Sequence, residues 1–479
     1  MPTDHKAIER LALSIQGFLD YEPNQEQTEL IAAFAIFCLD SPPNSVLVLD
    51  GYAGTGKTSL TGALVRALAY INRKTMLLAP TGRAAKVFAE YSRGQAFTIH
   101  RKIYRQKSYT RQYGNFTLAE NKHADTIFIV DEASMVGNTP AEGAAFGSGR
   151  LLDDLTHYVY SGDGCRLILL GDRAQLPPVG FDESPALSQS ALQGYGLAVY
   201  PFSLTEVVRQ RGDSGVLENA TRLRNAIARF QAGTLQRLLS PTLRLSGYPD
   251  IEPLSGEFLL EKIDDCYSRD GLAETIVITR SNKRATLYNL GIRAQALYRE
   301  EELTGGDMLL VAKNNYFWSE SYKELDFIAN GDVAQVRRVG GAESLYGLRF
   351  ANVTLEFPDH DIEIEARVIL DTLTSDTPAL TSQQSDALYS AVMQELEGDK
   401  RKRHQALKRH PYFNALQVKY GYAVTCHKAQ GGQWKNVFVD MGSIPADATA
   451  TLDFYRWLYT ALTRARERVY LINSRLDWI

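Results

Sequence analysis

The sequence predicts an α/β protein in which two parallel-sheet domains follow one another, with a β-hairpin inserted in the first and a small β-barrel inserted in the second. Short apolar runs separated by helical stretches indicate the buried strands of parallel sheets. A segment of strictly alternating residues indicates the barrel, since alternation is typical of half-exposed antiparallel strands. The expected domains are 1–205 with the hairpin at 101–125, 206–300 joined to 412–479, and the barrel with a helical arm at 301–411.

Helices open the first domain and buried strands follow them. Leu11 and Ile15 lie on the apolar face of an opening helix, and a second helix is expected from Thr28 to Cys38. The strand-like runs of the first domain are 46–49, 76–78, 127–130 and 167–170. The pattern returns in the second domain at 275–278, 437–439 and 469–472.

The barrel is expected where residues alternate, at 353–357 and 362–370. A helix follows, with Leu388, Val392 and Leu396 on one face. The basic run at 400–409 is more typical of a solvated helix end than of a DNA clamp.

Composition excludes several classes of protein. Apolar residues make up 44% of the 479 residues and charged residues 23%, values that exclude collagen-like, coiled-coil and disordered chains. The net charge of −4 gives no general attraction to nucleic acid, so a nucleic-acid site must come from local patches. The four cysteines lie too far apart for a zinc site or a disulfide framework, which predicts reduced, buried thiols. No apolar stretch is long enough to span a membrane and the N-terminus has no signal-like segment, so we expect a soluble, cytoplasmic protein.

Residues 51–58, GYAGTGKT, fit the phosphate-binding loop pattern GxxxxGK[ST] between an apolar strand and a helix-forming stretch. Glycines let successive backbone N–H groups face a phosphate, and the helix N-terminus adds its dipole. Lys57 is expected to pair with the β- and γ-phosphates and the Thr58 hydroxyl to ligate Mg²⁺. The pattern predicts binding of ATP or GTP.

The run at 127–130 ends in the adjacent carboxylates Asp131 and Glu132. Beside a phosphate loop, Asp131 is suited to hold Mg²⁺ and Glu132 to activate the attacking water. Gln175 follows another strand end and is a candidate sensor of the γ-phosphate, although a loop glutamine also bonds backbone. Arg209 and Arg464 are candidate sources of positive charge for phosphoryl transfer, although on spacing alone each is more easily a solvated surface group.

Three segments have the residue types that hold a single nucleic-acid strand. Thr81, Gly82 and Arg83 follow a strand, and Thr98 and His100 are expected to join them, although the histidine alone reads more simply as structural. Residues 101–113, RKIYRQKSYTRQY, interleave five basic residues with three tyrosines and indicate a hairpin that meets nucleic acid, with an exposed charged hairpin as the alternative.

The ordered motifs GYAGTGKTS, APTGRAAK, IVDEAS, LLGDRAQLPPVG, EVVRQ, VTCHKAQGGQW and YTALTRAR resemble those of superfamily 1 helicases, in the RecD/Dda-like branch called superfamily 1B. The resemblance extends from about residue 27 to residue 471. It implies two RecA-like (P-loop NTPase) domains with ATP in the cleft between them and a nucleic-acid strand across both. It also implies an SH3-like identity for the barrel and 5′-to-3′ translocation, and the direction rests on the resemblance alone.

The resemblance also assigns roles residue by residue. The implied nucleotide-binding residues are Gln27 at the adenine, Gly54, Thr55, Gly56, Lys57, Thr58, Ser59 and Gln433. Lys57, Glu132, Gln175, Arg209 and Arg464 are the implied catalytic residues, and Thr58 and Asp131 the metal ligands. The implied DNA contacts are Thr81, Gly82, Arg83, Thr98, His100, Asn282, Thr425, His427 and Lys428, and the implied strand-separating pin contains Tyr104, Tyr109 and Tyr113.

Two positions depart from the branch pattern. Val208 stands where many members carry an aromatic residue before the arginine, which weakens base stacking there. Gln433 stands where many members have glutamate, so it can still bond a ribose hydroxyl but without charge.

We therefore expect a monomeric, ATP- and Mg²⁺-dependent DNA helicase acting on single strands and duplex junctions, with repair and recombination as its setting. One alternative is a strand-stimulated ATPase that remodels protein–nucleic acid complexes. The other is the helicase subunit of a recombination or repair nuclease complex. The basic and aromatic hairpin favours strand separation over remodelling, and the full set of motor motifs favours a self-contained motor.

Overall fold

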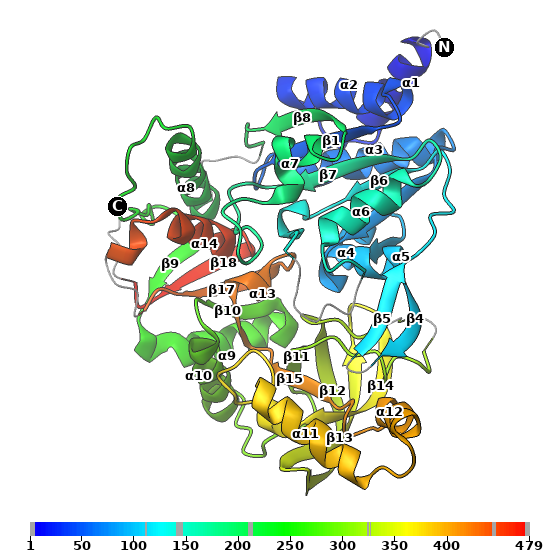
Figure 1. The fold of residues 1–479 in the computed structure, drawn as a ribbon. Helices are drawn as coiled ribbons and strands as arrows, with labels where there is room; N and C mark the ends of the chain where they lie inside the picture. The colour runs from blue at the N-terminus through cyan, green and yellow to red at the C-terminus, as the bar shows by residue number, and fades with distance from the viewer. Residues whose placement is uncertain are drawn as a thin grey trace. The chain divides into compact units, whose positions relative to one another are not determined.

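The computed structural model (Figure 1) describes residues 5–110, 113–139, 147–208, 214–322, 325, 327–442 and 447–474. Its contacts divide the chain into two units, residues 1–238 with 455–460 and residues 239–454 with 461–479. Among the described residues, no helix has the length and apolar character that crossing a bilayer requires.

A six-stranded parallel sheet is the centre of the first unit and confirms the first predicted sheet. Its strand order is β3-β2-β6-β7-β1-β8. The strands are β1 (Ser45–Gly51), β2 (Thr75–Ala79), β3 (Ala96–Thr98), β6 (Ile127–Val130), β7 (Arg166–Gly171) and β8 (Ala198–Leu204). The apolar runs predicted β1, β2, β6 and β7, because those strands have buried apolar centres. They did not predict β8, which lies at the sheet edge and is largely exposed.

Helices accompany this sheet, and a hairpin is inserted between β3 and β6 (Figure 1). The helices are α1 (His5–Gly17), α2 (Gln25–Asp40), α3 (Lys57–Tyr70), α4 (Gly82–Ser92), α5 (Ile99–Ile103), α6 (Leu151–Tyr160), α7 (Gln189–Gln193) and α8 (Gly215–Gln231). The hairpin strands β4 (Tyr104–Thr110) and β5 (Tyr113–Leu118) pair antiparallel. Leu11 and Ile15 of α1 are fully buried in a core shared with α2 and α3, as the helical pattern predicted.

The first unit continues to Leu238, past the expected boundary at 205. The reason is that helix α8 packs on the loop that follows β1. The Arg224 guanidinium lies 4.3 Å from the centroid of the Tyr52 ring. A Cβ atom at Gly54 would lie 3.2 Å from Leu217 of the same helix. These contacts bring residues 215–231 into the first unit.

The second unit contains a five-stranded parallel sheet of order β16-β10-β17-β18-β9, which confirms the second predicted sheet. Its strands are β9 (Ile251–Leu254), β10 (Thr275–Thr279), β16 (Ala423–Thr425), β17 (Trp434–Asp440) and β18 (Ala465–Ile472). Its helical segments are α9 (Leu259–Asp270), α10 (Asn282–Gly291) with a π-turn (Ile292–Ala296), α13 (Cys426–Ala429) and the two ends of α14 (Leu452–Leu462). The middle of α14, Tyr455–Thr460, belongs to the first unit.

A closed five-stranded barrel is inserted in the second unit, as the alternating residues predicted. Its strands are β11 (Met308–Val311), β12 (Val333–Leu345), β13 (Leu348–Phe357), β14 (Ile362–Ile369) and β15 (Leu416–Tyr420). Strand β15 lies beyond the expected barrel boundary at 411, because it closes the barrel by pairing antiparallel with β11 and parallel with β14. Helices α11 (Ser382–Glu395) and α12 (Lys400–Lys408) form the helical arm and share a small core with β13.

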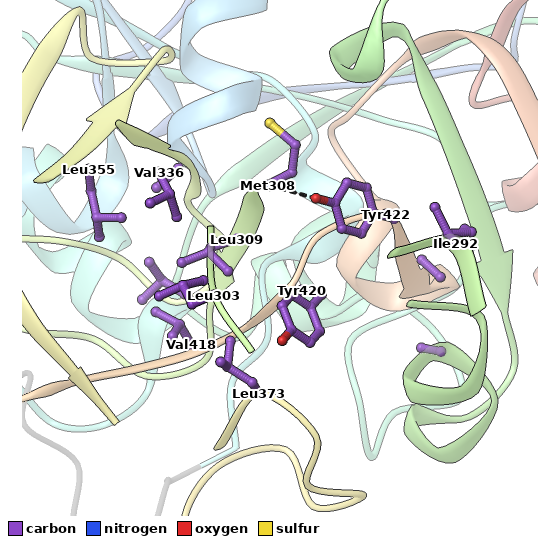
Figure 2. Close-up of a cluster of buried hydrophobic side chains, with 14 of the residues drawn as sticks. Ile292, Leu303, Met308, Leu309, Val336, Leu355, Leu373, Val418, Tyr420 and Tyr422 are labelled. Carbon is purple, nitrogen blue, oxygen red and sulfur yellow. Dashed lines mark hydrogen bonds between the residues drawn. The ribbon is translucent and has the colours of Figure 1, made fainter. Parts of the chain in front are cut away.

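The barrel and the second sheet share one hydrophobic core, shown in Figure 2. Tyr422 lies between them, and its hydroxyl oxygen accepts a hydrogen bond from the Met308 backbone N–H at 3.2 Å.

Beside this core the buried carboxylate of Asp307 accepts hydrogen bonds from the Arg293 side chain at 2.9 Å and from the Tyr422 hydroxyl at 2.7 Å. We call this cluster, completed by Arg299 and Thr304, the Asp307 cluster. It ties the start of the barrel to the π-turn after α10.

Candidate active site

The phosphate loop joins the end of β1 to the start of α3 in the first unit. Gly54 and Gly56 have φ angles of +80° and +84°, in the left-handed region that favours glycine. The turn at Gly56 leads directly into α3, so backbone N–H groups and the helix dipole meet at the loop. The Lys57 ammonium group donates a hydrogen bond to the Gly171 carbonyl at 3.1 Å. In this geometry the lysine extends from the loop toward the carboxyl end of β7.

Gln27 is fully buried beside this loop, and both polar ends of its amide are used within the protein. Its Oε1 accepts a hydrogen bond from the Asn24 backbone N–H at 3.1 Å, and its Nε2 donates to the Thr55 carbonyl at 3.0 Å. With Asn24 it forms a capping box, which is why α2 begins at Gln25 and not at Thr28 as expected. Gln27 therefore supports the phosphate loop in this structure, and its contact with adenine remains a prediction.

We expect a Gly56→Ala substitution to weaken nucleotide binding about tenfold or more. An alanine Cβ would lie 2.6 Å from Gln27 Nε2 and 3.1 Å from the Tyr21 hydroxyl, and φ of +84° strains any residue with a side chain. Tenfold corresponds to about 1.4 kcal/mol, the scale of left-handed strain alone. Titration of a fluorescent ATP analogue measures the change, with Gly17→Ala as the control because nothing lies within 4 Å of a Cβ there. An unchanged dissociation constant would contradict the role given to this loop.

The acidic pair follows β6 directly. The Asp131 carboxylate accepts hydrogen bonds from the Glu132 backbone N–H at 2.8 Å and from the Tyr91 hydroxyl at 2.6 Å. Glu132 has a φ angle of +51°, an uncommon conformation for a residue other than glycine that is often found at functional sites. The Thr58 hydroxyl and the Asp131 carboxylate are oxygen donors of the kind Mg²⁺ prefers, so these residues fit the metal that the phosphate loop implies.

The end of β7 brings a second acidic residue to the same edge of the sheet. Asp172 is buried, and burial raises the pKa of its carboxyl to about 6, against the opposing effect of the Lys57 ammonium. Its carboxylate accepts hydrogen bonds from the Ala174 backbone N–H at 2.9 Å and from the Tyr459 hydroxyl at 2.6 Å. The Tyr459 oxygen in turn accepts from the Ala53 backbone N–H at 3.1 Å. Tyr459 therefore joins the phosphate loop to the end of β7 within the first unit.

Gln175 lines a cavity of about 400 Å³ beside Asp172, in the first unit. Its side chain is buried, and Oε1 has no hydrogen-bond partner among the described residues. The Ser134 hydroxyl, which follows the acidic pair, lines the same cavity and likewise has no partner in the described part of the chain. Two buried polar atoms in one cavity can be satisfied by water or by a ligand oxygen.

The candidate arginines are described only in part. Arg464 is buried in the second unit, where it donates to the Gly432 carbonyl at 3.3 Å. Gln433, next to that carbonyl, is exposed. Arg209 lies outside the described residues, in the gap at 209–213.

Two neighbouring strand ends carry the predicted nucleic-acid residues of the first unit. Strands β2 and β3 are adjacent, with Ala79 opposite Thr98. Helix α4 starts after β2 with Thr81 as its cap, accepting from the Ala84 N–H at 3.2 Å. Thr98 caps α5 in the same way, accepting from Arg101 N–H at 3.2 Å. The structure thus brings Thr81, Gly82, Arg83, Thr98 and His100 to one edge of the sheet.

The second unit repeats this arrangement. Strands β10 and β16 are adjacent at its sheet edge, with Thr279 opposite Thr425. Helix α10 starts after β10 at Asn282 and is capped by the Ser281 hydroxyl, and α13 starts after β16 with Thr425 at the cap position but without a capping side-chain hydrogen bond. His427 on α13 is exposed and Lys428 is partly buried, which lowers the pKa of its ammonium group. The two units therefore resemble each other in the arrangement of strands and helices, which short sequence motifs do not reveal.

Burial restricts the contacts that two of the predicted nucleic-acid residues can make. Burial lowers the pKa of His100 to about 4, so its ring is neutral near pH 7 and can contact a phosphate only as a hydrogen-bond donor. Tyr104 is only 4% exposed, and its hydroxyl donates to Asp154 at 2.7 Å. That position anchors the base of the hairpin. The side chains of Tyr109 and Tyr113 lie outside the described part of the structure.

A phosphate loop, an acidic strand end and two parallel sheets define the class of protein as P-loop nucleotide-binding proteins. A model of an AAA domain matches residues 22–239, and a model of the UvrD-like helicase C-terminal domain matches residues 420–472. With its ordered motifs, these matches make the chain similar to superfamily 1B helicases of the RecD/Dda-like branch.

Individual relatives are distant. The ATP-dependent RecD2 DNA helicase of Deinococcus radiodurans is 24% identical over 442 residues, covering 90% of this chain and 47% of that protein. The ATP-dependent DNA helicase dda of Enterobacteria phage T4 is 25% identical over 271 residues, covering 55% of this chain and 56% of that protein. A crystal structure of Pif1 helicase from Bacteroides with ADP-AlF3 and ssDNA is 16% identical, with a TM-score of 0.46 and coverage of 95% and 93%. The chain spans about half the length, or less, of the first two curated relatives it matches.

Proposed function

We propose that this chain is an ATP-dependent DNA helicase that translocates 5′ to 3′ on single-stranded DNA and separates duplex. The observation that carries the proposal is the convergence at one sheet edge in the first unit. The phosphate loop follows β1 and the acidic pair follows β6, with β7 between the two strands. Ligands of open α/β sheets bind at the carboxyl ends of the strands, so this edge suits a nucleoside triphosphate.

In the proposed reaction, the phosphate loop and Lys57 hold the β- and γ-phosphates. Mg²⁺, held by Thr58 and Asp131, would neutralise phosphate charge. Glu132 accepts a proton from the attacking water, and Gln175 orients that water or the γ-phosphate. Arg209 and Arg464 stabilise charge that develops in the transition state.

The strand-end arrangement found in each unit supports the proposed DNA contact. Each unit offers two adjacent strands followed by helix N-termini, and hydroxyl side chains cap three of these four helices, a geometry suited to backbone phosphates. Thr81 and Thr98 lie in one such group, and Asn282 and Thr425 in the other. Translocation requires two grips whose separation changes with nucleotide state, and this chain has two groups of similar construction.

We assign two inserted modules to the same function. The hairpin β4–β5 is the proposed pin at the duplex junction, and the five-stranded barrel is the proposed SH3-like module of the branch. We propose a monomer as the active form, since each catalytic role above is filled from within one chain.

The test is unwinding of two partial duplexes, one with a 5′ tail and one with a 3′ tail, in ATP and Mg²⁺. Unwinding from the 5′ tail alone is the expected result. Unwinding from the 3′ tail alone contradicts the direction. Strand-stimulated hydrolysis with neither duplex opened favours the alternative, an ATPase that remodels protein–nucleic acid complexes, and the pin assignment then fails.

A further inference from the structure

Tyr91, which lies outside the sequence motifs, is a hydrogen-bond donor to the candidate metal ligand Asp131. Its hydroxyl donates to Asp131 Oδ2 at 2.6 Å, while the backbone N–H of Glu132 donates to Oδ1. Both carboxylate oxygens are therefore oriented by hydrogen bonds from within the protein. A hydrogen bond from a neutral donor to a carboxylate is short and comparatively strong.

The phenol is held from several sides. Its ring stacks on Phe88, one helical turn earlier in α4, with ring centroids 5.2 Å apart. The Tyr91 carbonyl accepts a hydrogen bond from Arg66 of α3 at 3.3 Å. At Gly62 of α3 the two helices touch so closely that a Cβ atom would lie 2.7 Å from the same carbonyl. The position of the hydroxyl is thus set by the packing of α4 on α3.

Helix α4 connects Tyr91 to the proposed DNA contact. The helix begins at Gly82, directly after the cap Thr81, and ends at Ser92. One rigid helix of 11 residues therefore joins the proposed DNA contact at its first turn to the Asp131 carboxylate at its last turn. If binding of single-stranded DNA shifts α4, the Tyr91 hydroxyl that donates to Asp131 moves with the helix.

We propose that Tyr91 is a positioning residue that orients Asp131 for Mg²⁺ and links the metal site to the strand held at the start of α4. The inference rests on the proposed function, since it requires Mg²⁺-dependent hydrolysis and strand binding. Partners that orient metal ligands commonly account for 10- to 100-fold in metal affinity or activity.

The test compares wild-type protein with Tyr91→Phe, which removes the hydroxyl and keeps the ring. We expect the Mg²⁺ concentration for half-maximal hydrolysis to rise about tenfold, and the ratio of strand-stimulated to basal hydrolysis to fall. Binding of Mn²⁺ to the complex with a non-hydrolysable ATP analogue, followed by electron paramagnetic resonance, should weaken by a similar factor. Affinity for single-stranded DNA without nucleotide should be unchanged, which also shows that the variant is folded.

Tyr160→Phe is the matched control, because its buried hydroxyl donates to the Ser45 carbonyl at the far end of β1. Gly62→Ala is a second variant that keeps the phenol and displaces its backbone, and it should raise the Mg²⁺ requirement in the same direction. An unchanged Mg²⁺ requirement or an unchanged stimulation ratio in Tyr91→Phe overturns the inference. Wild-type protein without Mg²⁺-dependent hydrolysis instead contradicts the proposed function itself.

Discussion

Replacing Glu132 with glutamine is expected to lower kcat for ATP hydrolysis by about 10²- to 10⁴-fold, the usual contribution of a general base. The amide is nearly the same size as the carboxylate but cannot accept the proton of the attacking water. The groups proposed to hold the triphosphate, Lys57 and the loop glycines, are unaffected, so the affinity for ATP should change by no more than about twofold. Steady-state hydrolysis and titration with a fluorescent ATP analogue separate the two quantities.

Glu9→Gln is the control for this substitution, since it removes an exposed carboxylate on α1 of the same unit. Turnover retained in Glu132→Gln would remove Glu132 from the catalytic role. Loss of ATP affinity in parallel with turnover would point instead to a collapsed site, because Glu132 has the strained φ angle of +51° and its backbone N–H holds Asp131.

The sequence predicted those parts of the fold that depend on local pattern. Buried parallel strands such as β1 and β7 are apolar at every central position, so a short run of letters identifies them. The phosphate loop is predicted from the sequence equally well. Its backbone angles are disfavoured for residues with side chains, so glycine is required at those positions. The acidic pair is legible because it follows such a strand directly.

The parts that were missed depend on contacts distant in sequence. Strand β15 belongs to the barrel only through pairing with β11 and β14, and no local pattern places it there. Tyr91 and Tyr459 touch carboxylates at the ends of β6 and β7 from helices elsewhere in the chain. A tyrosine on a helix is ordinarily read as core, so its hydroxyl contact carries no signal in the sequence.

Gln27 illustrates an intermediate case. The motif resemblance draws attention to this residue, and the structure places it beside the phosphate loop. The role that the structure supports, holding the Thr55 carbonyl and capping α2, follows from the spacing of Asn24 and Gln27 as a capping box. The spacing of these two residues is therefore a local sequence signal for the start of α2 that the family pattern does not contain.

The second large effect is expected from Asp307→Ala, which should destabilise the second unit by about 3–5 kcal/mol. Arg293 has only 6% of its side chain exposed, and removal of Asp307 leaves its guanidinium buried without the carboxylate. Unpaired buried charge is among the costliest defects a substitution can create. The Tyr422 hydroxyl, in the core shared by barrel and sheet, loses the same acceptor. Asp386→Ala, at an exposed position on α11, is the control and should change stability by less than about 0.5 kcal/mol.

The effect of Asp307→Ala is measured as a shift in the thermal or urea unfolding transition of the second unit. Limited proteolysis with cleavage sites between residues 239 and 454 monitors the unfolding of that unit. Burial acts to raise the pKa of Asp307, but hydrogen bonds from Arg293, Tyr422 and Thr304 outweigh burial and hold the pKa below its usual value. Because the folded-state pKa is depressed, the stabilisation is fully present above the unfolded value of about 3.9 and is lost as pH falls through the folded value. The difference in unfolding free energy between wild type and Asp307→Ala should therefore be constant from pH 6 to 8, because this range lies well above about 3.9. It should shrink in acid. A difference that grows in acid, or a wild-type transition no higher than that of the variant at neutral pH, would contradict the Asp307 cluster as the anchor of the barrel.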